Sequence, residues 1–456
     1  MSHERSDPRA GKYSPEMETL LRASNHAGRM IRGDWLSPHP EIMKIDLIRD
    51  SVLFFDESGV IISLVSVKDW AHKFGSELEI PETTRPGTIW TPGFVDTHVH
   101  YPQTQIIGSA SGPLLDWLDT SVFPEEAKFA EREYAEQVAQ RFCDSMLAHG
   151  TTTAAIFSSS HASATDQLFS TLSSRGLGGE VGLTLMDRGA PENVLCSAEE
   201  ALNACEELIE RWHDSNGSLR FCITPRFGLS CTPKLLKGAG ELADRFQLLT
   251  QTHLSENRAE LIATAEAFPE ASDYLNVYER FGLLNDRSLF AHCIWLSESE
   301  WTRFSSAGAS VAHCPDSNFF LGSGAMSLKV AHEHGVRVGL GSDVGAGRSF
   351  SMRKACARAY DASRITESDV TPSALYWLAT RGGALALKRP ELGLLEAGAR
   401  ADLVSIQPPP LFSNQSSSLA PDLKDPAQLI AQLIFCEDWN GTQEVRTNGI
   451  IRWCSE

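Results

Sequence analysis

The chain lacks the features that mark several large protein classes. Its ten cysteines include no CxxC pair, which argues against a zinc ribbon or a redox motif. No run approaches about 18 uninterrupted apolar residues, and the polar start MSHERSDPRAGKY has no apolar core of a signal peptide. A basic surface is missing too, because 40 Lys and Arg stand against 59 Asp and Glu. We therefore expect a cytoplasmic protein that binds neither nucleic acid nor membrane.

What the chain does contain is enough apolar sequence for a large packed core. Hydrophobic residues make up 42% of its 456 residues and charged residues 22%. This length allows two or three domains, or one large barrel with an attachment. The net charge of −19 does not select a substrate.

The two ends of the chain resemble each other and differ from the middle. After a polar tail over residues 1–27, the segment 28–90 carries short strand-like runs such as GVIISLVSV. The segment 386–456 carries similar runs, such as GLLEAGARADLVSIQ. Two β-rich ends around a different middle predict a small β-sandwich domain assembled from both termini. Residues 91–385 then form a domain of their own.

This middle segment alternates buried-strand candidates with stretches of helical spacing. Residues 125–149, closed by Gly150, and residues 199–214 have apolar positions on one helical face. The strand candidates are residues 93–99, 152–157, 181–186, 221–224, 248–252, 288–291, 310–312 and 337–341. Eight strands alternating with helices predict an α/β fold, a (β/α)8 TIM barrel, although periodicity alone does not exclude a doubly wound sheet.

Metal-binding residue types stand where four of these strands end, and a barrel collects catalytic groups at those ends. They are His98, His100, His253, His292 and Asp343. His98 and His100 are two residues apart on an extended chain, so both can face one ion. Histidine nitrogens and a carboxylate suit Zn²⁺ or Fe²⁺, and such an ion makes hydroxide available near neutral pH. Glu256, three residues beyond His253, suits a proton shuttle, with a helix cap as the alternative.

The motifs around these residues resemble the amidohydrolase superfamily. FVDTHVH, QTHLSEN, AHC and GLGSDV follow in that order between residues 92 and 345. Members with two metals usually carry a carboxylated Lys at the end of the fourth strand, where this chain reads CITPRF over residues 222–227. The resemblance thus implies the deaminase subtype with one metal ion per chain, Zn²⁺ or alternatively Fe²⁺. The ligands it implies are His98, His100, His253 and Asp343. It also implies that His292 and Asp343 orient the attacking hydroxide.

Further segments resemble the guanine deaminase family within that superfamily: HYPQ, GPLLDWLDTSVFPEE, TPRF, HLSEN and HCPDSN. In that family a Gln and an Arg hold the purine, which implies Gln103 and Arg226. Their donors suit the C6 carbonyl of guanine, whereas the amino group of adenine would leave the Arg unpaired at a cost of about 1–3 kcal/mol. Phe227, Trp117 or Leu115 is expected to pack on the ring face.

The resemblance implies hydrolysis of guanine to xanthine and ammonia by a metal-bound hydroxide, in a homodimer. Glu256 contacts the substrate and carries the proton from water to N3. One alternative is a deaminase or chlorohydrolase acting on a related ring, such as 8-oxoguanine, a pterin or a triazine. Another is a non-catalytic barrel that serves as a binding protein. The complete set of metal-site residues disfavours this last reading.

Overall fold

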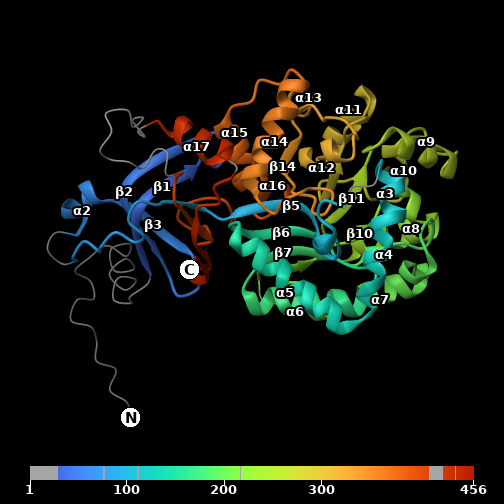
Figure 1. The fold of residues 1–456 in the computed structure, drawn as a ribbon, viewed down its shortest axis with the longest axis horizontal. Helices are drawn as coiled ribbons and strands as arrows, with labels where there is room; N and C mark the ends of the chain where they lie inside the picture. The colour runs from blue at the N-terminus through green and yellow to red at the C-terminus, as the bar shows by residue number, and fades with distance from the viewer. Residues whose placement is uncertain are drawn as a thin grey trace, which may run out of the picture.

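The computed structural model describes residues 29–74, 78–109, 112–215, 217–409, 425–436 and 438–455. The polar tail predicted over residues 1–27 lies outside these ranges. Figure 1 shows the described chain in two parts. The first and last strands of the sequence share a sheet on one side, and strands wrapped by helices lie on the other.

The terminal sheet has seven strands in the order β17-β16-β15-β4-β1-β2-β3. Their bounds are β1 (Met30–Pro38), β2 (Ile45–Phe55), β3 (Ile61–Ser66), β4 (Ile89–Pro92), β15 (Leu403–Ile406), β16 (Thr442–Thr447) and β17 (Ile450–Cys454). Strands from both ends of the chain therefore build this part, as predicted. The described strands form one hydrogen-bonded sheet in place of the two separate sheets of a sandwich. The reason is β4, which pairs parallel to β1 and antiparallel to β15 and so joins the N-terminal meander to the C-terminal hairpin.

Aromatic side chains fill both faces of this sheet. Helix α2 (Val67–Phe74) packs Trp70 and Phe74 against Phe54 of β2. Trp35 and Trp90 lie in a separate buried cluster and contact each other at 5.8 Å between ring centroids. Burying two apolar faces gives the sheet a core of its own.

The middle of the chain forms the predicted barrel of eight parallel strands, arranged as two four-stranded arcs. The arcs are β5-β6-β7-β9 and β11-β12-β13-β14. The strands are β5 (Phe94–His100), β6 (Thr151–Phe157), β7 (Gly178–Gly182), β9 (Leu219–Phe221), β11 (Thr250–Leu254), β12 (Ser288–His292), β13 (Ser310–His313) and β14 (Arg337–Leu340). A bridge between Ile223 and Thr250 joins the arcs on one side. Short strands β8 (Thr184–Leu185) and β10 (Thr224–Pro225) pair beside it.

The barrel closes where the chain beyond β14 meets β5. The Asp343 amide donates to the His98 carbonyl at 2.8 Å, and the His100 amide donates to the Val344 carbonyl at 2.9 Å. The seam of the barrel therefore runs through the predicted metal site.

Most of the described helices lie on the outside of the barrel, and several begin at a side chain that caps the first turn. The helices are α3 (Leu114–Trp117), α4 (Phe123–Glu126), α5 (Arg132–Ala148), α6 (Ala162–Arg175), α7 (Ala198–Trp212), α8 (Pro233–Arg245), α9 (Arg258–Ala267), α10 (Tyr274–Arg280), α11 (Glu298–Ala307), α12 (Pro315–Phe320), α13 (Leu328–Glu333), α14 (Met352–Ile365), α15 (Pro372–Trp377), α16 (Gly383–Ala386) and α17 (Pro426–Phe435). The α7 helix begins at a capping box between Ser197 and Glu200. The helix predicted over residues 125–149 is interrupted, because Glu131 adopts an extended conformation and α5 begins after it. None of the described helices is long and apolar enough to cross a membrane.

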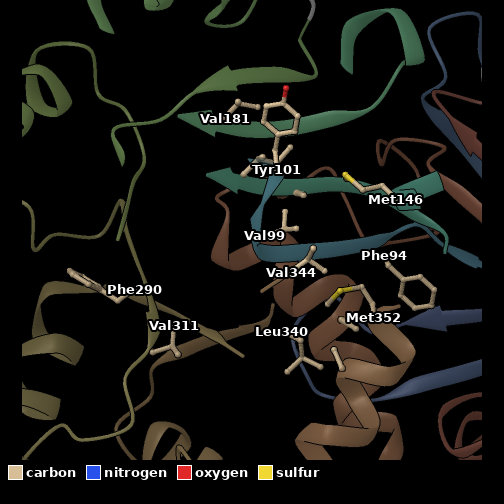
Figure 2. Close-up of a cluster of buried hydrophobic side chains, with 14 of the residues drawn as sticks. Phe94, Val99, Tyr101, Met146, Val181, Phe290, Val311, Leu340, Val344 and Met352 are labelled. Carbon is tan, nitrogen blue, oxygen red and sulfur yellow. The ribbon is translucent and has the colours of Figure 1, made fainter. Parts of the chain in front are cut away.

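Strand alternation separates the apolar packing from the polar site. Val99, Val181, Phe290, Val311 and Leu340 belong to the large buried cluster between the strands and the helices (Figure 2). A second cluster fills the interior of the barrel. Val95, Leu249 and Leu289 belong to it, and each lies three or four residues before a site histidine. Leu387 and Leu392, which follow α16, also belong to it. The carboxyl ends of the strands are thereby left for polar side chains.

Candidate active site

The β5 strand brings His98 and His100 to the same side despite an irregular register. Its pairing with β6 shifts between Asp96 and Val99, so the alternation of the strand restarts at His98. The Asp96 carboxylate accepts hydrogen bonds from the amides of His98 at 3.2 Å and Ser342 at 2.9 Å. Burial raises the pKa of Asp96 to about 6. This carboxyl ties the bulge to the last strand of the barrel.

His253 and Asp343 complete a group of four. His253 is the next-to-last residue of β11. Its Nδ1 lies 2.5 Å from the Arg226 carbonyl, so Nδ1–H donates and Nε2 faces the centre. Asp343 Oδ1 lies 3.3 Å from Nε2 of both His98 and His100. One donor atom from each of the four residues lies within 4.8 Å of the others. The four residues predicted as ligands are therefore placed together.

The electrostatics of this group fit a bound cation. Nε2 of His100 and Nε2 of His253 face each other at 3.2 Å, and Nε2 of His98 has no hydrogen-bond partner among the described residues. Burial lowers the pKa of His100 to about 4 and that of His253 well below its usual value, so both imidazoles are neutral near pH 7. Burial raises the pKa of Asp343, but the facing histidines outweigh it and hold that pKa well below its ordinary value. Converging lone pairs beside a carboxylate repel one another until a divalent ion is bound.

His292 reaches the site through an unusual backbone conformation. Leu289 and Ala291 face inward on β12, so strict alternation would turn His292 outward. Positive φ values of 71° at His292 and 51° at Cys293 change the direction of the chain there. The His292 Nδ1 then lies 2.8 Å from Asn318 Oδ1, which fixes Nδ1–H as a donor. Its Nε2 lies 3.8 Å from Asp343 Oδ2.

Glu256 lies beside His292, with 3.5 Å between Glu256 Oε2 and His292 Nε2. Burial, and after it the charge of Asp343, raises the pKa of Glu256 to about 8. The Ser323 hydroxyl donates to Oε1 at 3.1 Å and so holds the carboxyl in place. A carboxyl with such a pKa can both take up and release a proton at neutral pH.

The metal-binding group except His98, together with Glu256 and His292, lines a cavity with about 390 Å³ of empty space, its open mouth included. Gln103, Arg226 and Phe227 line it too. Gln103 lies on the 3-10 helix Tyr101–Ile106 directly after β5, and Arg226 follows β10. Metal ligands, a proton carrier and the two polar residues predicted to hold a base therefore share one space.

The apolar wall of the cavity comes largely from α3 and the turn after it. Leu114, Trp117 and Leu118 line it, and their spacing places them on one helical face. Leu115 was also predicted to stack on the ring. It is not among the described lining residues, because it lies on a different face of α3 from Leu114 and Trp117. Phe227 and Trp117 do line the cavity.

Comparison with known proteins identifies the family. The model of the amidohydrolase family matches residues 89–430. The chain is 35% identical to guanine deaminase of Escherichia coli (strain K12) over 394 residues, which cover 85% of this chain and 90% of that protein. It is also 35% identical to guanine deaminase of Rattus norvegicus over 400 residues, 84% of this chain and 86% of the relative. The chain belongs to the guanine deaminases of the amidohydrolase family.

A solved structure of the family agrees with this assignment. Guanine deaminase from C. acetobutylicum, with guanine bound in its active site, superposes with a TM-score of 0.84 at 30% identity. The match covers 93% of this chain and 99% of that one. This amidohydrolase thus shares its fold with relatives over nearly its whole described length.

Among the residues of the amidohydrolase site that sequence reasoning missed, three contact the predicted histidines or arginine. Phe157 ends β6 and packs its ring against His98, His100 and His253 at centroid distances of 4.9, 4.7 and 4.8 Å. Asn318 orients His292, and the third residue, Glu126, contacts Arg226. Asn318 and Glu126 lie in the runs HCPDSN and VFPEE, so the family resemblance contained a signal for both. An apolar strand end gives no comparable signal for Phe157.

Proposed function

We propose that this chain hydrolyses guanine to xanthine and ammonia with one bound divalent metal ion. The observation that carries the proposal is the shared cavity, in which the metal-binding group, Glu256 and the pair Gln103 and Arg226 meet. Membership among the guanine deaminases supports guanine as the base.

Four residues would hold the ion: His98, His100, His253 and Asp343. Three imidazoles and one carboxylate form a donor set that suits Zn²⁺, with Fe²⁺ as the alternative. Bound there, the ion lowers the pKa of a coordinated water to about 7 and so supplies hydroxide at neutral pH.

Glu256 and His292 carry the proton chemistry in this proposal. Because Asn318 accepts from Nδ1–H, His292 Nε2 is left to accept a hydrogen bond from the attacking water and to orient it toward C2 of the base. Glu256 takes the water proton and delivers it to N3 of the ring. The remaining proton of the added water then passes from the C2 hydroxyl to the amino group, the C–N bond breaks, and ammonia leaves as the C2 carbonyl of xanthine forms. Asp343, besides its part in the ligand set, helps to orient the attacking oxygen.

Gln103 and Arg226 hold the base in the proposal. The guanidinium offers donors to the C6 carbonyl, and the Gln amide offers one donor and one acceptor. Phe227 and Trp117 line the cavity where a flat ring would lie, so they would pack on its faces. Glu256 also contacts the ring edge through N3.

Ammonia release from a panel of bases tests the proposal, together with metal content by mass spectrometry. The panel contains guanine, 8-oxoguanine, adenine, cytosine, isoxanthopterin and a triazine. We expect about one zinc or iron ion per chain and guanine as the preferred substrate. Preference for another ring would overturn the choice of base, and an active metal-free protein would overturn the mechanism. The homodimer stays a prediction, which sedimentation velocity tests.

A further inference from the structure

A buried carboxylate joins the two residues proposed to hold the base. Glu126, the last residue of α4, is 1% exposed. Its Oε2 accepts from Arg226 Nη1 at 2.7 Å, and its Oε1 accepts from Gln103 Nε2 at 3.3 Å. Glu126 is not among the described residues that line the cavity, so it lies behind both of them.

This arrangement fixes the direction of the Gln103 amide. The Gln103 Oε1 accepts from the Gly345 amide at 3.2 Å while Nε2 donates to Glu126. Both ends of the amide are therefore assigned, and one N–H and one lone pair remain for a ligand. Without the carboxylate, the amide would be held at one end only.

The carboxylate also compensates a buried charge. The Arg226 side chain is 4% exposed, and the ion pair with Glu126 joins two groups that are almost fully removed from water. Burying a guanidinium without a partner costs much free energy and makes the electrostatic potential around it positive. The pair as a whole has no net charge, and a neutral base can bind beside it without displacing either partner.

We propose that Glu126 is the positioning and specificity-determining residue of the base-binding wall, holding Gln103 and Arg226 in place and neutralising Arg226 so that the cavity selects a neutral base over an anionic one. This inference rests on the proposed function, because it concerns how the same cavity chooses its substrate. Glu126 acts through its two neighbours and does not touch the reacting atoms.

The substitution Glu126→Gln tests both parts of the inference. An amide at this position has a single oxygen, so either Arg226 or Gln103 would face an N–H donor instead of an acceptor. The positive charge of Arg226 would also lose its compensation. Binding of guanine should weaken, and binding of an anionic purine should strengthen relative to a neutral one.

Glu125→Gln is the matched control. Glu125 is the preceding residue of α4 and is also buried, but its carboxylate pairs with Lys128 at 2.6 Å and with the Tyr134 hydroxyl. Neither partner is among the described residues that line the cavity. Both variants therefore remove one buried carboxylate from the same helix, and only one of them changes the base-binding pair.

The experiment measures kcat and KM for guanine and inhibition by two purines with a C6 oxygen. Urate carries a negative charge near neutral pH, and hypoxanthine is neutral. In Glu126→Gln we expect KM to rise about tenfold or more, with a smaller change in kcat. The preference for urate over hypoxanthine should rise by about tenfold relative to wild type. Glu125→Gln should keep wild-type values for both.

Equal KM and equal inhibitor preference in the two variants would overturn the inference. If Glu126→Gln does not fold, as judged by circular dichroism, Glu126→Asp replaces it. That variant keeps the charge but shortens the reach, so KM should rise while the inhibitor preference stays at the wild-type value. A wild-type KM in Glu126→Asp would equally refute the positioning role. Failure of the wild-type chain to deaminate guanine would refute the proposed function instead, and the two failures are thus distinct.

Discussion

Replacing Glu256 by Gln should separate catalysis from stability in this site. The amide has the same shape and can still accept the hydrogen bond from Ser323, so the side chain should stay in place. It cannot carry a proton, and we expect kcat for guanine to fall about 10³-fold or more. Metal content should remain at about one ion per chain, because Glu256 is outside the ligand group.

The same substitution should stabilise the metal-free protein in a pH-dependent way. The Glu256 pKa is about 8 in the folded chain against 4.5 for an exposed glutamate. The folded state therefore binds this proton more tightly, so the contribution to stability is complete below pH 4.5 and is lost as the pH rises toward 8. At pH 7 this carboxyl contributes about 3 kcal/mol less to the free energy of unfolding than it does below pH 4.5, since each pH unit in that window costs about 1.4 kcal/mol.

Urea unfolding of metal-free protein at pH 5 and pH 7 measures this effect. Between the two conditions, Glu256→Gln should gain about 2.5 kcal/mol of unfolding free energy relative to wild type. Glu266, an exposed residue of α9, provides the control substitution Glu266→Gln, which should show no such gain. A stability difference that does not change with pH would refute the account, as would near-normal turnover by Glu256→Gln.

Four other changes should give distinct results. Asn318→Leu removes the hydrogen-bond partner of His292 Nδ1 and should lower kcat about 10–100-fold with metal content unchanged. Steady-state kinetics and mass spectrometry measure the two quantities. Loss of the metal would contradict this role for Asn318. Arg226→Lys keeps the charge but offers a single donor group, so KM for guanine should rise about tenfold or more, and an unchanged KM would exclude Arg226 from base binding. Asp343→Asn should bind less than one ion per chain and lose activity, and full metal occupancy would place the site elsewhere. Removing the metal from the wild-type protein with a chelator should lower Tm, and added zinc should restore it. A Tm that does not change with chelator would rule out a metal within this four-residue group.

Much of the barrel and its ligand group could be predicted, because eight strand candidates alternate with helices and because the family resemblance implies the four ligands. His98 and His100 face one way on an extended chain, and His253 lies at the end of a predicted strand. The family motifs then supplied the order in which these strands occur. Local patterns of this kind survive folding because alternation decides which side chains enter the barrel.

What could not be predicted depends on contacts between distant residues or on backbone geometry. Glu126 contacts Arg226, which is 100 positions away in the sequence, and the sequence around neither residue predicts this contact. His292 was expected at the site, but the positive φ that brings it there has no signature in AHC. The single terminal sheet depends on β4 pairing on both edges, a long-range choice that composition does not reveal.

The seam of the barrel has a consequence for how the protein matures. The ligand group takes residues from the first, fifth and last strands, and the seam hydrogen bonds of Asp343 and His100 join the first strand to the segment after the last. A chain still being synthesised holds at most three of the four ligands until residue 343 has emerged, and they converge only when the ring closes. Metal loading therefore reports completed folding, and a truncated or open barrel would remain empty of metal even in excess zinc.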